Sequence, residues 1–223
     1  MAVPSAADRG AEREEMVRRQ LAARGVADAA VLAAMAEVPR EVFVPEDLAA
    51  FAYQDGPLPI GYGQTISQPY VVARMAEALE LRPGDRVLEV GTGSGYAAAV
   101  LSRVAHAVFT VERHAPLAAA ARERLRRLGY DGVTVRHADG TGGWAEHAPY
   151  DAVMAAAAPR ELPAALSEQL AVGGRLVAPV GDPLGGQSLL RVRRAGPADF
   201  RTEDLGPVRF VPLLPGTGEE RRE

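Results

Sequence analysis

Apolar positions in the first quarter of the chain recur at the three- and four-residue spacing of amphipathic helices. The expected helices cover residues 12–24, 29–38 and 47–51, with an extended passage at 43–45. Gly25 and Pro39 end the first two helices, and Asp28 is a typical N-cap for the second. We expect this region to flank the core and to shape the entrance to a site.

Six glycines and prolines fall within residues 55–69, a density that predicts a loop without regular structure. Long structured loops in compact domains are usually functional. Two roles remain open for Ser67, near the end of this loop. It could cap the helix expected at 70–79, or it could belong to an active site, and the two roles are compatible.

From residue 86 onward, short apolar runs alternate with helical runs. The expected strands are 86–90, 107–112, 133–137 and 151–155, and the expected helices are 97–103, 116–128 and 163–170. This alternation predicts right-handed βαβ crossovers and a three-layer αβα, doubly wound, mostly parallel sheet. Three later runs, at 175–180, 187–194 and 208–214, are joined only by loops and predict antiparallel strands at the C-terminal end.

Residues 86–96 join an apolar strand to a helix through Gly91, Gly93 and Gly95. This G-x-G-x-G spacing is tighter than that of a dinucleotide-binding loop, although the strand–turn–helix context also suits a ligand. Glu89, two positions before the first glycine, would repel a pyrophosphate but suits a cation that carries hydroxyl groups and an amine. S-adenosylmethionine is such a ligand.

Acidic residues follow or end three successive expected strands, namely Glu89, Glu112 and Asp139. Ligands of doubly wound sheets lie across the carboxyl ends of the strands. Glu112 comes 17 residues after Gly95, close to the distance at which Rossmann-type folds place a carboxylate on ribose hydroxyls. Asp139 is placed to accept a hydrogen bond from an adenine amine. The pattern therefore indicates a site for adenosine and a cation.

Composition narrows the function classes. The 223 residues are 48% hydrophobic, enough for one sizeable core, and the net charge of −4 gives no basic field for nucleic acid. The absence of cysteine excludes disulfides and thiolate chemistry, and four scattered histidines have no metal-ligand spacing, so no metal site is expected. The first twenty residues contain no apolar signal segment, and no run reaches the ~18 apolar residues of a membrane span. We expect a monomeric cytoplasmic protein without nucleic-acid or membrane partners.

Taken together, these motifs resemble those of the protein-L-isoaspartate O-methyltransferase family, from about Met16 to Leu213. The glycine loop alone indicates a class I methyltransferase, whereas the loop Gln64–Pro69 and the segment Phe210–Leu213 are far more specific. The other segments that carry the resemblance are residues 38–45, 58–63, 111–113, 139–140 and 173–181.

The resemblance implies a Rossmann-like enzyme that moves a methyl group from S-adenosyl-L-methionine to the α-carboxylate of L-isoaspartyl residues, leaving S-adenosyl-L-homocysteine. The substrates would be damaged proteins or peptides, repaired through a succinimide. Ser67 matches the family's active-site serine. The cofactor-binding residues expected on this basis are Gln64, Thr65, Ile66, Ser67, Glu89, Gly91, Thr92, Gly93, Ser94, Gly95, Tyr96, Glu112, Arg113, Asp139 and Gly140.

The chain departs from the family pattern at two positions. Ala156 stands where a threonine is common, and Thr141 follows Asp139-Gly140 where an aromatic residue is often found. Both changes bear on the range of substrates. They keep open an alternative, a methyltransferase that acts on a normal aspartate of one dedicated peptide in natural-product biosynthesis. A nonenzymatic adenosine-binding module and an NAD-dependent oxidoreductase are disfavoured, the first by Ser67 and the three acids, the second by the glycine spacing and Glu89.

A single methyltransferase domain is expected over residues 1–223. Its parts would be an N-terminal helical flank with the active-site loop (1–66), a cofactor-binding core (67–180), C-terminal strands (181–214) and a polar tail (215–223).

Overall fold

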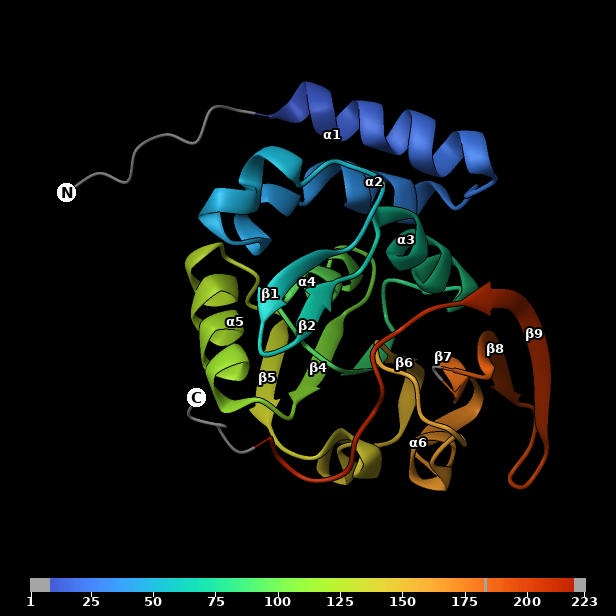
Figure 1. Cartoon of the computed structure of the whole chain (residues 1–223). Helices are drawn as coiled ribbons and strands as arrows, with labels where there is room; N and C mark the ends of the chain where they lie inside the picture. Colours follow the sequence, from blue (N-terminus) through green and yellow to red (C-terminus); the bar gives the residue numbers. More distant parts are fainter. Residues whose placement is uncertain (1–8, 183, 219–223) are drawn as a thin grey trace.

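The computed structural model describes residues 9–182 and 184–218 (Figure 1). The first eight residues and the last part of the expected tail, 219–223, lie outside the described residues. The N-terminal flank begins with α1 (Gly10–Met16), which a π turn (Val17–Leu21) and a 3-10 turn (Ala22–Arg24) continue. Helix α2 (Ala29–Glu37) follows, and then two 3-10 turns (Arg40–Phe43 and Glu46–Phe51).

The ends of these helices follow the sequence signals. Gly25 ends the first helical segment in the left-handed region, at φ 92°. The carboxylate of Asp28 accepts hydrogen bonds from the backbone N–H groups of Ala30 and Val31, as an N-cap does. Both predictions are confirmed.

A seven-stranded sheet with the order β5-β4-β3-β6-β7-β8-β9 forms the centre of the molecule. Its strands are β3 (Arg86–Val90), β4 (Ala107–Glu112), β5 (Val133–His137), β6 (Tyr150–Ala155), β7 (Leu170–Asp182), β8 (Gly186–Arg194) and β9 (Phe200–Val208). The first five strands in this order pair in parallel, and β7, β8 and β9 pair antiparallel. The predicted sheet, mostly parallel with an antiparallel C-terminal end, is confirmed.

Helices cover both faces of this sheet in three layers. Alternate residues of the strands face opposite sides, so Val87 packs with the N-terminal helices while Leu88 packs on the other face. Helices α3 (Pro69–Ala78), α4 (Tyr96–Leu101) and α5 (Ala115–Arg127) carry core residues of the first face. The opposite face is covered by α6 (Ala164–Glu168) and the 3-10 turns Gly140–Gly142 and Ala145–His147. In Figure 1, α5 and β9 mark opposite sides of the molecule.

The segment 55–69 contains a hairpin, so the prediction of an irregular loop was wrong. Strands β1 (Leu58–Gly61) and β2 (Gln64–Ile66) pair antiparallel in a separate two-stranded sheet. Positive φ angles at Gly61, Tyr62 and Gly63 make the tight turn that joins them. Glycines and prolines are compatible with a sheet of two strands because each strand has a free edge.

Of the two roles left open for Ser67, the structure excludes the helix cap. Helix α3 begins at Pro69, so the N-cap position falls on Gln68, which makes no side-chain capping bond. Proline is favoured at the first helical position because its fixed φ suits the helix and its missing N–H would be unpaired there. Ser67 is therefore free of a capping role.

Two boundaries differ in the C-terminal half. Strand β7 begins at Leu170, earlier than the expected start at residue 175, and runs through the Gly173-Gly174 pair with a register shift against β6. The third antiparallel strand lies at Phe200–Val208 instead of 208–214. Its sequence lacks an apolar alternation because β9 is the edge strand and is largely exposed.

Candidate active site

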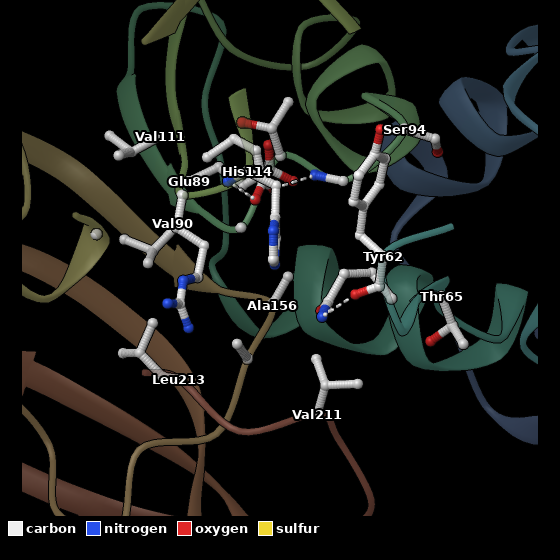
Figure 2. A pocket seen from close by; sticks show the side chains of 18 of the residues that line it. Tyr62, Thr65, Glu89, Val90, Ser94, Val111, His114, Ala156, Val211 and Leu213 are labelled. Atoms are coloured by element: carbon white, nitrogen blue, oxygen red, sulfur yellow. Dashed lines mark hydrogen bonds between the residues drawn. The ribbon is translucent and has the colours of Figure 1, made fainter. Parts of the chain in front are cut away.

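A large cavity lies at the carboxyl ends of the parallel strands, where β3 is flanked by β4 on one side and β6 on the other. Its volume is about 1210 Å³, above the 300–1,000 Å³ of common small-molecule pockets. From β3 the chain order of the strands runs outward to β4 and β5 on one side and to β6 and β7 on the other. This reversal of strand order is the switch point at which doubly wound sheets bind ligands. Figure 2 shows Glu89 and Val90 in this cavity, with Thr65 and Tyr62 across from Leu213. We refer to it as the first cavity.

Glu89 is the most perturbed group of the first cavity. Its side chain is fully buried, and burial raises its pKa to about 8, a rise that the hydrogen bond from Thr110 opposes and the charge of Glu112 increases. The Thr110 hydroxyl donates to Oε2 of Glu89 at 2.6 Å, so Thr92, 2.7 Å away, must donate to Thr110. Oε1 of Glu89 has no hydrogen-bond partner among the residues that the structure describes. A buried acceptor thus remains available to a ligand.

Glu112 is held in place by backbone donors. Its Oε2 accepts a hydrogen bond from the N–H of Gly93 at 2.8 Å, and its Oε1 accepts one from the N–H of His114 at 2.9 Å. Each carboxylate oxygen offers about two lone-pair sites, so one site on each oxygen stays free. The carboxylate both orients the glycine loop and keeps two acceptor positions for a ligand.

Helix α5 contacts the glycine loop, and the N-terminal flank contacts the first residue of α4. Arg124 donates to the carbonyl of Ser94 at 2.8 Å. Gly95 adopts φ 91° at the N-cap of α4, and a Cβ there would lie 3.2 Å from Cδ1 of Leu125. The ring of Tyr96 is buried beneath the guanidinium of Arg40, 5.0 Å away. Gly95 therefore serves close helix packing, and it does not line the first cavity.

Asp139 is placed differently from what its strand-end position suggested. Its Oδ1 accepts from the backbone N–H and the hydroxyl of Thr141, both at 2.8 Å, and its Oδ2 accepts from the N–H of Gly216 at 2.6 Å. Burial acts to raise the pKa of Asp139, but these hydrogen bonds outweigh it and hold the pKa below its ordinary value. The side chain is outside the lining of the first cavity, and its contact with adenine stays a prediction.

Most of the residues predicted from the sequence do meet in the first cavity. Those that line it are Gln64, Thr65, Ile66, Ser67, Glu89, Gly91, Thr92, Gly93, Ser94, Tyr96, Glu112, Arg113 and Gly140. Their roles toward a ligand remain predictions. No group of three His, Asp or Glu side chains within 9–182 and 184–218 is arranged to hold a metal ion.

The rim of the first cavity includes residues that sequence reasoning missed. Tyr62, at the turn of the β1-β2 hairpin, stacks on His114 with ring centroids 5.8 Å apart (Figure 2). The C-terminal segment crosses the same rim, since Gly218 donates its N–H to the carbonyl of Arg113. An aromatic residue between two glycines was a signal for Tyr62, whereas nothing local marked residues 217–218.

A second cavity of about 680 Å³ adjoins the first, between α3 and residues 205–211. Both cavities are lined by Thr65, Ser67, Ala156 and Val211. Val211 reaches this position because its carbonyl accepts from the N–H of Ala158, at 2.8 Å. The Ser67 hydroxyl forms no hydrogen bond with the described part of the chain and lies at the junction of the two cavities.

The family model for Protein-L-isoaspartate(D-aspartate) O-methyltransferase matches residues 11–218. The protein-L-isoaspartate O-methyltransferase of Methylorubrum extorquens (strain PA1) is 61% identical over 211 residues, which cover 95% of this chain and 92% of the relative.

Solved structures agree with the sequence comparison. A protein-L-isoaspartate O-methyltransferase is similar with a TM-score of 0.81 and 31% identity, covering 92% of this chain and 67% of the other. A structure of the same kind from Plasmodium falciparum, in complex with S-adenosyl-L-homocysteine, gives a TM-score of 0.77 at 26% identity, with 91% and 98% covered. The chain therefore belongs to the protein-L-isoaspartate (D-aspartate) O-methyltransferase family.

Proposed function

We propose that this protein transfers a methyl group from S-adenosyl-L-methionine to the α-carboxylate of L-isoaspartyl residues in proteins or peptides. The observation that carries the proposal is the junction of two cavities at Ser67. A cofactor in the first cavity and a polypeptide in the second would meet there. Membership of the family supports the choice of reaction.

The residues of the first cavity fit this cofactor. The unpartnered buried Oε1 of Glu89 suits the cationic amino-acid end of S-adenosylmethionine, and burial strengthens that attraction. The two free acceptor sites of Glu112 suit the vicinal hydroxyls of a ribose. The cavity is also large enough for a nucleoside with an amino-acid tail.

When bound, S-adenosylmethionine supplies an electrophilic methyl group on its sulfonium. The acceptor is an α-carboxylate whose ordinary pKa lies near 3.5, so it is already ionised at neutral pH and needs no general base. The hydroxyl of Ser67, which has no partner within residues 9–182 and 184–218, donates a hydrogen bond that orients one acceptor oxygen. Orientation of this kind supplies up to about 7–11 kcal/mol of the barrier reduction.

Methylation prepares repair because the methoxy group of the ester departs readily as methanol, whereas the oxygen of a free carboxylate is a poor leaving group. The backbone nitrogen of the following residue attacks the ester, methanol departs, and the resulting succinimide hydrolyses in part to a normal aspartyl linkage. These later steps need no further residue of the enzyme.

The alternative, methylation of a normal aspartate in one dedicated peptide, differs in the position of the acceptor. A normal aspartyl carboxylate lies one methylene further from the main chain, and a misplacement of about 1 Å can cost about a hundredfold in rate. A matched pair of synthetic peptides that differ only in this linkage tests the proposal through methanol release. We expect efficient reaction of varied isoaspartyl peptides. Preference for the aspartyl peptide, or activity confined to one sequence, would support the alternative instead.

We further propose that the protein is a monomer and acts in the cytoplasm, without nucleic-acid or membrane partners. Among the described residues, no helix combines the length and apolar character needed to cross a bilayer. Light scattering on the purified chain measures the oligomeric state, and a dimer would contradict that part of the proposal.

A further inference from the structure

Three arginines line the second cavity together with several apolar side chains. The arginines are Arg24, Arg74 and Arg209, while Val71, Leu189, Leu205, Val208 and Phe210 contribute apolar surface. No Asp or Glu side chain belongs to the lining that the structure describes. A cavity of this composition attracts an anionic, partly apolar occupant.

The three guanidinium groups differ in how far they are already paired. Arg209 is exposed and makes no hydrogen bond or ion pair with the residues of 9–182 and 184–218. Arg24 lies 2.9 Å from the carboxylate of Asp55, and its guanidinium stacks 3.7 Å above the ring of Tyr70. Stacking fixes the orientation of Arg24 toward the cavity and leaves some of its N–H donors free.

Arg74 is similar to Arg24, because it reaches a single carboxylate, that of Glu77, at 3.3 Å. Its side chain remains 40% exposed, as does that of Arg24. Glu77 is also engaged by the backbone N–H groups of Ala27 and Asp28. Arg24 and Arg74 are each paired with a single carboxylate, so both keep guanidinium N–H donors for a ligand. The lining therefore keeps its positive character.

The distance from the start of α3, two residues after Ser67, to Arg74 limits which part of a substrate reaches the second cavity. Pro69 and Arg74 both belong to α3, and at 1.5 Å per residue their Cα atoms are about 7.5 Å apart along the axis. An extended peptide covers this distance in two to three residues, at about 3.3 Å each. A side chain within about three positions of the isoaspartyl residue can therefore reach the second cavity.

We infer that the second cavity binds the substrate residues that neighbour the isoaspartyl residue, and that Arg24, Arg74 and Arg209 favour acidic side chains there. This inference rests on the proposed function and adds a sequence preference to it. The guanidinium groups attract acidic residues that flank the isoaspartyl residue, whereas they repel lysines in the same positions.

The test uses three isoaspartyl peptides that carry glutamate, glutamine or lysine two and three positions from the isoaspartyl residue, on either side. Each partly exposed charge pair changes binding by about two- to fivefold. We therefore expect the KM of the glutamate peptide to be about threefold or more below that of the glutamine peptide, with a further rise for lysine. The ratio should shrink in 0.5 M salt, and kcat should change little.

Arg209→Glu provides the decisive variant because the arginine side chain is exposed and has no partner in the described part of the chain. It should weaken the preference for glutamate and improve the lysine peptide, whereas Arg201→Glu serves as the control. Arg201 is exposed on β9 and pairs with Asp199 at 3.4 Å, outside both cavities. The preference should survive in the control.

Equal KM values for the three peptides with the wild-type protein would overturn the inference and leave the proposed function intact. Identical preferences in Arg209→Glu and wild type would also overturn it. If the wild-type protein methylates none of the isoaspartyl peptides, the proposed function fails and the inference fails with it.

Discussion

Glu89→Gln should stabilise the ligand-free protein and weaken its binding of cofactor. The wild-type carboxyl is fully buried, burial raises its pKa to about 8, and its Oε1 has no partner within 9–182 and 184–218. Glutamine has nearly the same shape, and its amide oxygen can accept the hydrogen bond from Thr110 that the carboxyl accepts now. The substitution therefore removes a titratable group with little change of packing.

The size of the stability effect follows from the raised pKa. The unfolded carboxyl ionises above its ordinary pKa of 4.5, whereas the folded carboxyl keeps its proton up to about pH 8. Between these values the folded state binds more protons than the unfolded state, so the free energy of unfolding falls as pH rises, by about 1.4 kcal/mol per pH unit. At pH 7 the wild-type penalty reaches up to about 3 kcal/mol, which is several degrees in Tm for a chain of this length.

Thermal melting of the ligand-free proteins between pH 5 and 8 measures this effect. The gain in Tm of Glu89→Gln over wild type should be small at pH 5 and should grow toward pH 8. Glu123→Gln is the matched control, since Glu123 is exposed on α5 and pairs with Arg126. Equal Tm values for Glu89→Gln and wild type across this range would refute the reasoning from burial.

Cofactor binding should change in the opposite direction. Titration calorimetry with S-adenosyl-L-homocysteine should show wild-type affinity rising with pH between 6.5 and 8, because the ammonium of the ligand favours the ionised carboxylate. In Glu89→Gln the affinity should be lower and nearly independent of pH. A variant that binds as tightly as wild type at pH 8 would show that Glu89 does not contact the ligand.

Other substitutions test the remaining parts of the site. Glu112→Ala should lose about 1.5–3 kcal/mol of S-adenosylhomocysteine affinity, because charge-assisted hydrogen bonds disappear, and unchanged calorimetry would rule out its contact with ribose. Gly93→Val should abolish that binding in a protein whose circular dichroism is unchanged; affinity equal to wild type would contradict a cradle at this loop. Gly95→Ala should lower stability by about 1–3 kcal/mol in urea unfolding, since its φ is 91° and its Cβ would lie 3.2 Å from Leu125; an unchanged midpoint would be inconsistent with tight packing there. Ser67→Ala should reduce kcat, with Tm and cofactor affinity almost unchanged because Ser67 caps no helix; full activity would remove its role in orienting the acceptor.

Local sequence signals determined the parallel part of the fold and the core of the first cavity. Apolar strands that alternate with helices admit few other packings, since right-handed crossovers bring the carboxyl ends of successive strands to one edge. Glu89 and Glu112 end adjacent strands and were therefore placed correctly in the same cavity. Gly95 and Asp139 followed the same logic, yet the structure uses Gly95 for packing on α5 and engages Asp139 with backbone N–H groups. Proximity to a motif could not reveal which neighbour each residue would contact.

Only the tertiary structure decided how the second cavity forms and where it meets the first. Thr65 and Val211 line the junction although 146 positions separate them in the sequence. They meet because β9 returns the chain along the sheet edge and the carbonyl of Val211 then accepts a hydrogen bond from Ala158. The sequence around Val211 has no periodicity that encodes this contact, since a bridge to a distant loop depends on partners and not on local propensity. The arginines of the second cavity, which come from three separate segments, are brought together for the same reason.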